Sequence, residues 1–172
     1  MKSQIELRQL LSVEEEIVPL SDLLVRVVEE GASIGFLPPL SLDVANDYWN
    51  SVIAPDVVLY VAYMNDQMVG SVQLHFSTKQ NGNHRVEIAK LMTHPDYRRH
   101  GIGRLLMQKA EQKAIELGKT LIVLDTREGD PSNQLYSSLG YIQAGRIPQY
   151  ARSATGELDA TIFYYKLLNS HE

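Results

Sequence analysis

The chain has 172 residues, of which 44% are hydrophobic and 22% are charged, and its formal net charge is −5. This length and composition predict one globular domain over residues 1–172, and the mildly acidic balance argues against general nucleic-acid binding. The sequence has no cysteine, which excludes a disulfide framework, a thiol nucleophile and a cysteine–zinc site. The N-terminal residues lack the apolar core of a signal peptide, and no apolar run reaches membrane-spanning length. We therefore expect a cytoplasmic protein with no membrane partner.

The first quarter of the sequence predicts one strand and two helices. IELRQL (5–10) alternates between apolar and polar residues, as a half-buried strand does. Apolar residues recur at helical spacing over 13–30, and we expect Pro19 to divide that segment. GASIGFLPPL (31–40) is rich in glycine and proline and predicts a loop. Residues 42–53 predict a second short helix, in which Tyr48 and Trp49 are expected to be core residues.

Three strands are predicted next. VVLYVAYM (57–64) and QMVGSVQLHFS (67–77) flank the turn residues Asn65 and Asp66, which indicates a hairpin. HRVEIAKLMT (84–93) alternates as a third strand. Strand parity places Glu87 on one face with Ala89, Leu91 and Thr93, unless a bulge intervenes.

The remaining sequence alternates between helical and extended patterns. A helix is predicted over 102–117 and ends at Gly118, and LIVL (121–124) predicts a central strand covered on both faces. A second helix, PSNQLYSSL, is expected to be N-capped by Asp130 and to end at Gly140. Two strands follow, at about 141–147 and 160–168. This order of elements indicates a mixed α/β sheet with helices on its faces.

A basic, glycine-containing turn, HPDYRRHGIGRLLM (94–107), joins the third of these strands to the long helix. The helix N-terminus leaves backbone N–H groups free, and glycines at 101 and 103 allow an anion to come close to them. Charge-assisted donors surround these amides, namely Arg98, Arg99, His100 and Arg104. The turn suits a pyrophosphate, although the turn alone also fits a surface helix start with solvated arginines.

Other phosphate and nucleic-acid motifs do not fit this turn. A Rossmann fingerprint needs a third glycine at position 106, where the sequence has Leu106. The GKT at 118–120 lacks the first P-loop glycine, because Lys113 occupies its place. A helix-turn-helix is excluded because the basic residues follow a strand.

Two motifs resemble those of the GNAT superfamily of N-acetyltransferases. RRHGIG fits the signature [Q/R]-x-x-G-x-[G/A], with Arg98, Gly101 and Gly103 in the defining places. NQLYSSLGYI (133–142) is similar to the second motif of the superfamily, and it comes in the correct order and at the correct spacing. The resemblance implies a mixed, mostly antiparallel sheet of six to seven strands, with helices on both faces and splayed central strands. It also implies acetyl-CoA as donor and a primary amine as acceptor.

The same resemblance implies where acetyl-CoA binds. The amides of residues 99–104 would hold the pyrophosphate, and the strand end at Leu91, Met92 and Thr93 would pair its backbone with the pantetheine arm. Asn133 is expected to contact the CoA arm, unless it caps the helix or faces solvent. The donor-binding residues implied are Leu91, Met92, Thr93, Arg98, Arg99, His100, Gly101, Ile102, Gly103, Arg104, Asn133 and Tyr136.

Direct aminolysis of a thioester needs an unprotonated amine, and a lysine-like amine has a pKa of about 10.4. Glu87 and Asp125 are the candidate proton acceptors, directly or through water, and either carboxylate could instead bind the cationic amine. The alternatives are a solvated strand carboxylate for Glu87 and a loop acceptor for Asp125. Tyr136 corresponds to the superfamily tyrosine near the CoA sulfur, where a hydrogen bond to the thiolate would suffice; its alternative is a core aromatic.

The acceptor is expected to bind at the GASIGF loop, through Ser33, Ile34 and Phe36, and at Tyr150, together with Glu87 and Asp125. Several further segments, among them EIAKLM and LDTREG, resemble GNAT enzymes that acetylate a toxin-like β-lactam amino acid. We therefore expect an N-acetyltransferase for a small-molecule amine, such as an antibiotic or a toxin-like amino acid. A protein N-terminal or lysine acetyltransferase and a non-catalytic acyl-CoA sensor are the alternatives.

No metal is expected, because His75, His84, His94 and His171 lack the spacing of metal ligands. A homodimer remains open.

Overall fold

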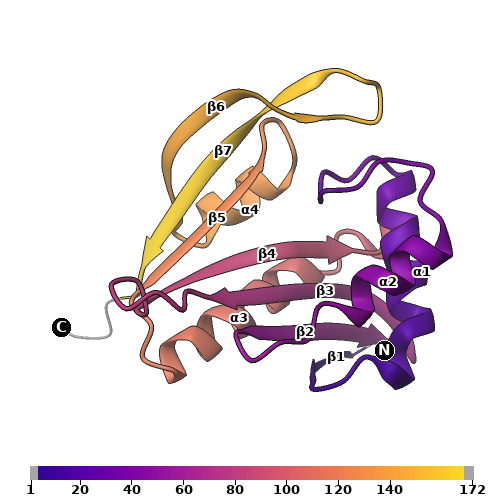
Figure 1. The fold of residues 1–172 in the computed structure, drawn as a ribbon, viewed down its shortest axis with the longest axis horizontal. Helices are drawn as coiled ribbons and strands as arrows, with labels where there is room; N and C mark the ends of the chain where they lie inside the picture. The colour runs from indigo at the N-terminus through magenta and orange to yellow at the C-terminus, as the bar shows by residue number, and fades with distance from the viewer. Residues whose placement is uncertain (1–3, 169–172) are drawn as a thin grey trace.

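The computed structural model describes residues 4–168 as a curved sheet with helices on both of its faces (Figure 1). The strands are β1 (Ile5–Leu10), β2 (Val57–Met64), β3 (Gln67–Phe76), β4 (Arg85–Thr93), β5 (Leu121–Arg127), β6 (Ile142–Arg152) and β7 (Leu158–Leu167). The helices are α1 (Ile17–Glu29), α2 (Leu42–Asn50), α3 (Ile102–Glu116) and α4 (Ser132–Ser138), with 3-10 turns at Glu14–Glu16 and Pro95–Tyr97.

The seven strands form one sheet in the order β1-β2-β3-β4-β5-β7-β6. All neighbours are antiparallel except β4 and β5, which are parallel. These two strands pair only where Arg85–Glu87 of β4 lies beside Leu121–Val123 of β5. Beyond that point they diverge, as the widening gap between the two ribbons shows (Figure 1). The predicted mixed, mostly antiparallel sheet with splayed central strands is confirmed.

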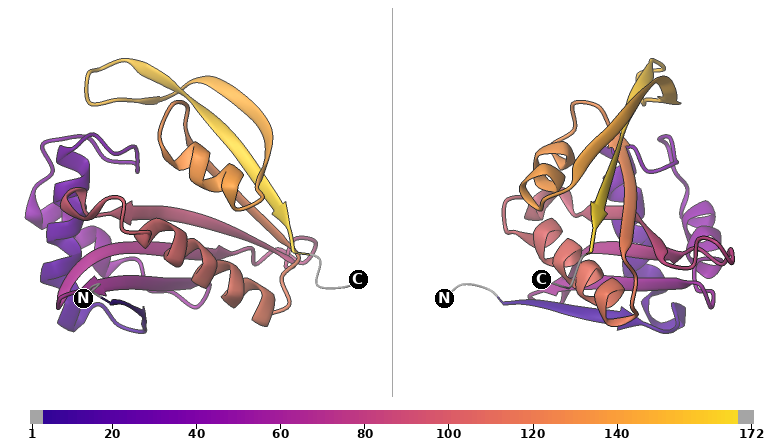
Figure 2. Two further views of the ribbon diagram at one scale, coloured as in Figure 1. Left: turned by 180° about the vertical axis from the view of Figure 1, so that it is seen from behind. Right: turned by 90° about the vertical axis from the view of Figure 1, so that its left-hand side faces the viewer.

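Helices lie on both faces of the sheet (Figure 2), and each face has its own apolar core. On one face, α3 and α4 cover the sheet, and Leu106 and Met107 of α3 are fully buried. On the other face, α1 and α2 cover β2 and β3, with Leu20 and Trp49 fully buried. The near-continuous apolar sequence of β2 is explained by this coverage on both sides. The predicted placement of helices on both faces is confirmed, as is Trp49 as a core residue.

A bulge interrupts β4. Gln73 of β3 pairs with Ala89 of β4, and Ser71 of β3 pairs with Met92 of β4. Two steps along β3 therefore correspond to three steps along β4. One extra residue is therefore inserted in β4 between these pairs. Lys90 lies in this interval with a φ of 56°, in the left-handed region that non-glycine residues rarely adopt.

The bulge reverses the alternation of β4. Ile88, before the bulge, packs in the core under α3, whereas Met92, after it, packs in the core under α1 and α2. Leu91 packs on the α3 side, and Thr93 lies close to the N-terminus of α3. The bulge that the sequence analysis allowed for is present, so Glu87 does not share a face with Leu91 and Thr93.

Two local predictions about helix starts are wrong. Pro19 does not divide a helix; it lies in the first turn of α1, where its missing N–H is not needed. Asp130 does not cap α4, because its carboxylate accepts a hydrogen bond from Arg127 Nε at 3.0 Å. Pro131 takes the N-cap position, with no side-chain capping bond. The predicted strand 121–124 continues to Arg127, which places Asp125 inside β5.

Candidate active site

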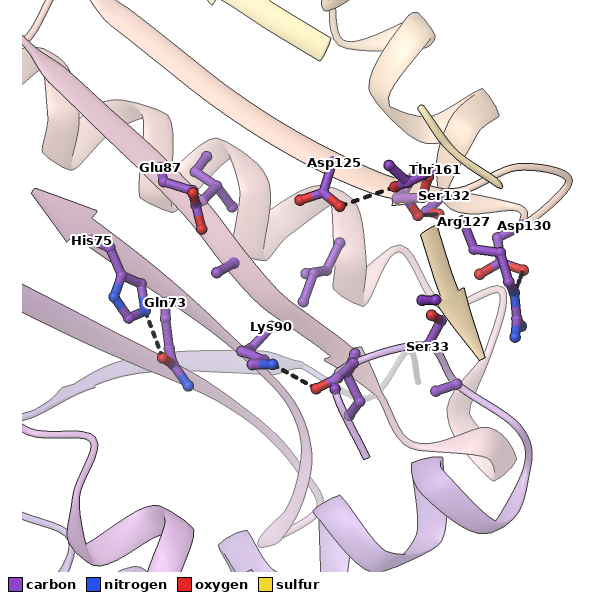
Figure 3. A pocket seen from close by; sticks show the side chains of 18 of the residues that line it. Ser33, Gln73, His75, Glu87, Lys90, Asp125, Arg127, Asp130, Ser132 and Thr161 are labelled. Atoms are coloured by element: carbon purple, nitrogen blue, oxygen red, sulfur yellow. Dashed lines mark hydrogen bonds and ion pairs between the residues drawn. The ribbon is translucent and has the colours of Figure 1, made fainter. Parts of the chain in front are cut away.

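A cavity of about 610 Å³ opens where β4 and β5 separate (Figure 3). Its walls come from the loop after α1, from the sheet strands β3, β4 and β5, from α4, and from the β6–β7 hairpin. Among the residues that line it are Ser33, Ile34, Tyr48, Gln73, His75, Glu87, Lys90, Asp125, Arg127, Tyr136, Tyr150 and Thr161. The divergence of the two parallel strands therefore creates the space for a ligand at the centre of the sheet.

Two carboxylates point into this cavity from neighbouring strands (Figure 3). Glu87 lies on β4 just before the bulge, and Asp125 lies on β5 beyond its last pair with β4. Asp125 Oδ2 accepts a hydrogen bond from Thr161 Oγ1 at 2.9 Å, which fixes its orientation. Within residues 4–168, Glu87 accepts no side-chain hydrogen bond, so both of its oxygens are open to a ligand. The structure thus brings the two predicted proton acceptors together.

Tyr136 reaches the same cavity from α4. Its ring packs between those of Tyr141 and Tyr164, at centroid distances of 5.8 and 5.9 Å. Burial raises the pKa of Tyr136, and the negative charge of Asp125 raises it further. The hydroxyl group therefore remains protonated near neutral pH and acts as a hydrogen-bond donor toward the cavity.

The loop before α3 is exposed and leaves backbone amides unpaired. The first intrahelical bond runs from Leu105 N to Gly101 O, at 3.0 Å, so the amides just before Leu105 have no helical acceptor. Arg99 and Gly101 have positive φ values of 67° and 77°. Arg98, Arg99 and His100 are all exposed to solvent. This loop therefore offers donors and positive charge on an accessible surface.

Gly103 has a packing role in addition to the one expected from its sequence. A Cβ atom there would lie 3.3 Å from Leu135 Cδ2, so glycine allows the first turn of α3 to approach α4. Arg104 supports the same contact, because its guanidinium donates to Ser138 Oγ at 2.7 Å. Ile102 is buried, so only its backbone is available at the loop. The side chain of Met92, near the end of β4, is also buried, so only its backbone is available to a ligand.

A sequence model of the Acetyltransferase (GNAT) family matches residues 24–141, more than half of the chain. The chain belongs to this family. Its fold is similar to that of a GNAT-family acetyltransferase from Streptococcus pneumoniae, with a TM-score of 0.80 and 18% identity, covering 96% of this chain and 100% of that one. It is also similar to ribosomal-protein-alanine N-acetyltransferase from Brucella melitensis, with a TM-score of 0.79 and 20% identity over 94% and 99% of the two chains.

A third similar structure, from Salmonella typhimurium, contains its cofactor acetyl-CoA. Its TM-score is 0.77 at 18% identity, covering 96% of this chain and 95% of that one. At these identities the structural likeness establishes the fold. Membership of the GNAT family establishes that this chain is an acetyl-CoA-dependent acetyltransferase.

The loop expected to bind the acceptor closes one side of this GNAT cavity. Ser33 and Ile34 line the cavity, and so does Tyr150, whose ring stands edge-on to Phe163. Arg127 holds the start of the loop by donating to Gly31 O at 3.0 Å. Phe36 lies outside this cavity and lines an adjoining one of about 220 Å³. Three of the four predicted loop and hairpin residues are therefore brought together.

Lys90 is a cavity residue that the sequence analysis missed. Its ammonium group donates to Ile34 O at 2.5 Å and lies 5.8 Å from the ring centroid of Phe36. Burial lowers the pKa of Lys90, although Asp125 and Glu87 act in the opposite direction. Strict alternation would have placed this lysine on the face opposite Glu87. The signal in the sequence was a lysine with two apolar residues on each side of it, in IAKLM.

Three more polar side chains are linked by hydrogen bonds along the cavity wall. His75 Nε2 is 2.8 Å from Gln73 Oε1, and Gln73 Nε2 donates to the Tyr48 hydroxyl at 2.9 Å. Burial raises the pKa of Tyr48. Tyr48 packs against the core under α1 and α2 and is only partly buried there, because it also lines the cavity. Gln73 and His75 could have been noticed as polar residues on the same face of the apolar strand SVQLHF.

Asn133 is occupied by contacts within the chain. Its Nδ2 donates to Arg127 O and to Asp130 O, both at 2.9 Å, and its Oδ1 accepts from the Tyr164 hydroxyl at 2.8 Å. These bonds close the turn between β5 and α4. Asn133 therefore does not cap α4, which has no side-chain capping bond, and its expected contact with the CoA arm stays a prediction.

The described part of the chain has no group of three or more His, Asp or Glu side chains placed to hold a metal ion. His171, considered for metal binding, lies outside the described residues. Among the helices of residues 4–168, none is long and apolar enough to cross a membrane.

Proposed function

We propose that this GNAT enzyme is an N-acetyltransferase that moves the acetyl group of acetyl-CoA to a primary amine of a small molecule by direct aminolysis. The observation that carries the proposal is the walled cavity of about 610 Å³, into which two carboxylates and a protonated tyrosine point. Its volume is within the range of small-molecule sites. We further propose that residues 1–172 act as one domain in the cytoplasm.

The residues at the start of α3 fit the diphosphate of acetyl-CoA. Unpaired amides precede Leu105, and Arg98, Arg99 and His100 add positive charge beside them. The end of β4, from Leu91 to Thr93, has no strand partner on the side from which β5 has diverged, so its backbone can pair with an extended arm. When bound, acetyl-CoA supplies the acetyl group as a thioester.

Each of the three reactive side chains in the cavity has a separate role. Asp125, fixed by Thr161, orients the incoming ammonium group, and Glu87, whose oxygens are unpaired, accepts the proton that the amine loses. The neutral amine nitrogen then forms the new bond to the acetyl carbon as the carbon–sulfur bond breaks, and the second proton of that nitrogen passes through water to the released thiolate, which gives the amide and the free thiol. Tyr136 donates a hydrogen bond to the departing sulfur. Because the pKa of Tyr136 is raised, hydrogen bonding is favoured over complete proton transfer.

The segments quoted above for a toxin-like amino acid are similar to the tabtoxin resistance protein, a GNAT enzyme that acetylates a β-lactam amino acid. This resemblance supports an acceptor of the antibiotic or toxin-like class. The Gly31–Phe36 loop supports a small acceptor as well, because it is tied to Arg127 and Lys90 and closes one side of the cavity. An acyl-CoA sensor would not need Glu87, Asp125 and Tyr136 in one cavity.

An acceptor screen tests the proposed function. Purified enzyme is incubated with acetyl-CoA and tabtoxinine-β-lactam, aminoglycosides, polyamines, amino acids or peptides, and thiol release is followed. We expect acceptor-dependent thiol release with a small amine and an N-acetylated product by mass spectrometry. Turnover of peptides alone would identify a protein acetyltransferase. Acetyl-CoA binding without any acceptor-dependent release would favour the sensor.

A further inference from the structure

The charges inside the cavity are unusual for a site that takes a simple amine. Two carboxylates, Glu87 and Asp125, attract a cationic acceptor, yet Lys90 projects into the same space from the bulge of β4 (Figure 3). The other charged residues that line the cavity form ion pairs with one another, since Arg127 pairs with Asp130 and with Asp159. A lysine there repels any further positive charge on the acceptor. The cavity therefore separates a negative part, beside Asp125, from a positive part beside Ile34.

Lys90 has no counter-ion. Among residues 4–168, no carboxylate lies within ion-pair distance of its ammonium group, and the carbonyl of Ile34 accepts only one of its three N–H donors. The group is also partly removed from water, which lowers its pKa. A desolvated cation costs free energy unless an anion pairs with it.

The absence of a side chain at Gly35 makes room for the ammonium group of Lys90. A Cβ atom at Gly35 would lie 2.9 Å from Lys90 Nζ, so any other residue there would push the lysine aside. Lys90 itself lies in the left-handed region, because the bulge turns it toward the cavity. The lysine is therefore held next to the loop that closes the acceptor side, with donors left over.

We propose that Lys90 binds a carboxylate of the acceptor and determines its specificity, so that the acceptor is an amino acid. The amine lies at Asp125 and Glu87 and the carboxylate at Lys90. This inference rests on the proposed function, since it assigns the acceptor class of the same cavity. It distinguishes the acceptor from polyamines and aminoglycosides, which place a second cation where Lys90 already lies.

Matched acceptors test the role of Lys90. Methionine is compared with 3-(methylthio)propylamine, and lysine with cadaverine, which differ within each pair by the carboxylate. We expect the wild-type enzyme to prefer the amino acid in kcat/KM. Lys90→Met should lower kcat/KM for the amino acid by about 10- to 100-fold, the scale of one charge-assisted hydrogen bond, and change it less than about twofold for the amine. Lys90→Arg should keep most of the preference, and the exposed Lys79→Met should change neither value.

An equal loss for both members of a pair in Lys90→Met would overturn the inference and leave Lys90 as a residue that only holds the loop. A wild-type preference for the carboxylate-free amines would overturn it as well. Calorimetric titration of the same compounds separates this failure from failure of the proposed function. If no acceptor is turned over, tighter binding of methionine than of 3-(methylthio)propylamine, with the difference abolished in Lys90→Met, still supports the carboxylate site. Equal binding of the two compounds excludes it.

Discussion

Burial beside Tyr164 raises the pKa of Tyr136 and keeps its hydroxyl group protonated, so that it can donate a hydrogen bond. Tyr136→Phe removes the hydroxyl group and keeps the ring. We expect kcat to fall by about 10- to 100-fold, the low end of acid–base effects, while the KM for acetyl-CoA changes less than about twofold. Tyr164→Phe is the matched control, because its hydroxyl bonds Asn133 outside the cavity, so it should lower Tm and preserve kcat. A large rise in acetyl-CoA KM in Tyr136→Phe would contradict the assigned role.

Glu87 and Asp125 differ in their hydrogen bonds, so their neutral variants should differ in kinetics. Glu87→Gln should lower kcat and flatten the acidic limb of the pH–rate profile, because the group that must be ionised is removed. Asp125→Asn should chiefly raise the acceptor KM, because it removes the charge that orients the ammonium group. Steady-state kinetics from pH 5 to pH 9 check both variants. An unchanged acidic limb in Glu87→Gln would move the proton-acceptor role to Asp125 or to water.

The predicted reactive residues came from chemistry and motif resemblance, and Glu87, Asp125 and Tyr136 all line one cavity. Lys90 could not be predicted in the same way. Its direction depends on a bulge, and a bulge arises from how β4 pairs with β3 rather than from the sequence of β4 alone. Strand alternation is reliable only while the register is unbroken.

At the scale of elements, α3 offers a direct test of its N-terminal loop. Gly101 and Gly118 flank the helix with nearly equal φ values, 77° and 74°, and a Cβ atom at either would meet open space. Alanine at either position should therefore cost a similar amount of stability, about 1 kcal/mol. Gly101→Ala should also weaken acetyl-CoA binding, because the amides beside it shift, and Gly118→Ala should not. Calorimetry and thermal unfolding measure the two effects, and equal acetyl-CoA affinities would argue against a pyrophosphate site in this loop.

Helices and strands with strong periodicity were predicted close to their observed bounds, α3 and β2 among them. The failures lie at element ends. Asp130 is a good capping residue in isolation, but Arg127 takes its carboxylate and Asn133 closes the turn instead. Competition of this kind depends on side chains that meet only in the folded chain, so local propensity could not decide it.

At the scale of the whole molecule, the two parts of the sheet share only a short parallel pairing between β4 and β5. Lys166 of β7 strengthens this connection, because it bonds Glu111 of α3 at 3.0 Å and Leu139 O at 2.7 Å. Lys166→Met leaves Glu111, whose side chain is only 13% exposed, without its partner and should lower the free energy of unfolding by about 2 kcal/mol. Arg146→Met breaks the exposed ion pair with Glu128, which water and salt screen, and should lower the free energy of unfolding much less than Lys166→Met does. Urea unfolding measures both, and equal losses would show that burial of the pair has no effect.

The separation of β4 from β5 places an unpaired strand edge inside the molecule. Such edges normally lie at the rim of a sheet, where they must be protected from pairing with other chains. Here residues of α4, the Gly31–Phe36 loop and the β6–β7 hairpin stand around the opening. We expect these surrounding residues to keep a strand of another protein from pairing with this edge, while a ligand in the cavity can still reach the backbone. The edge that binds the donor would then be shielded from aggregation by the same residues that enclose the cavity.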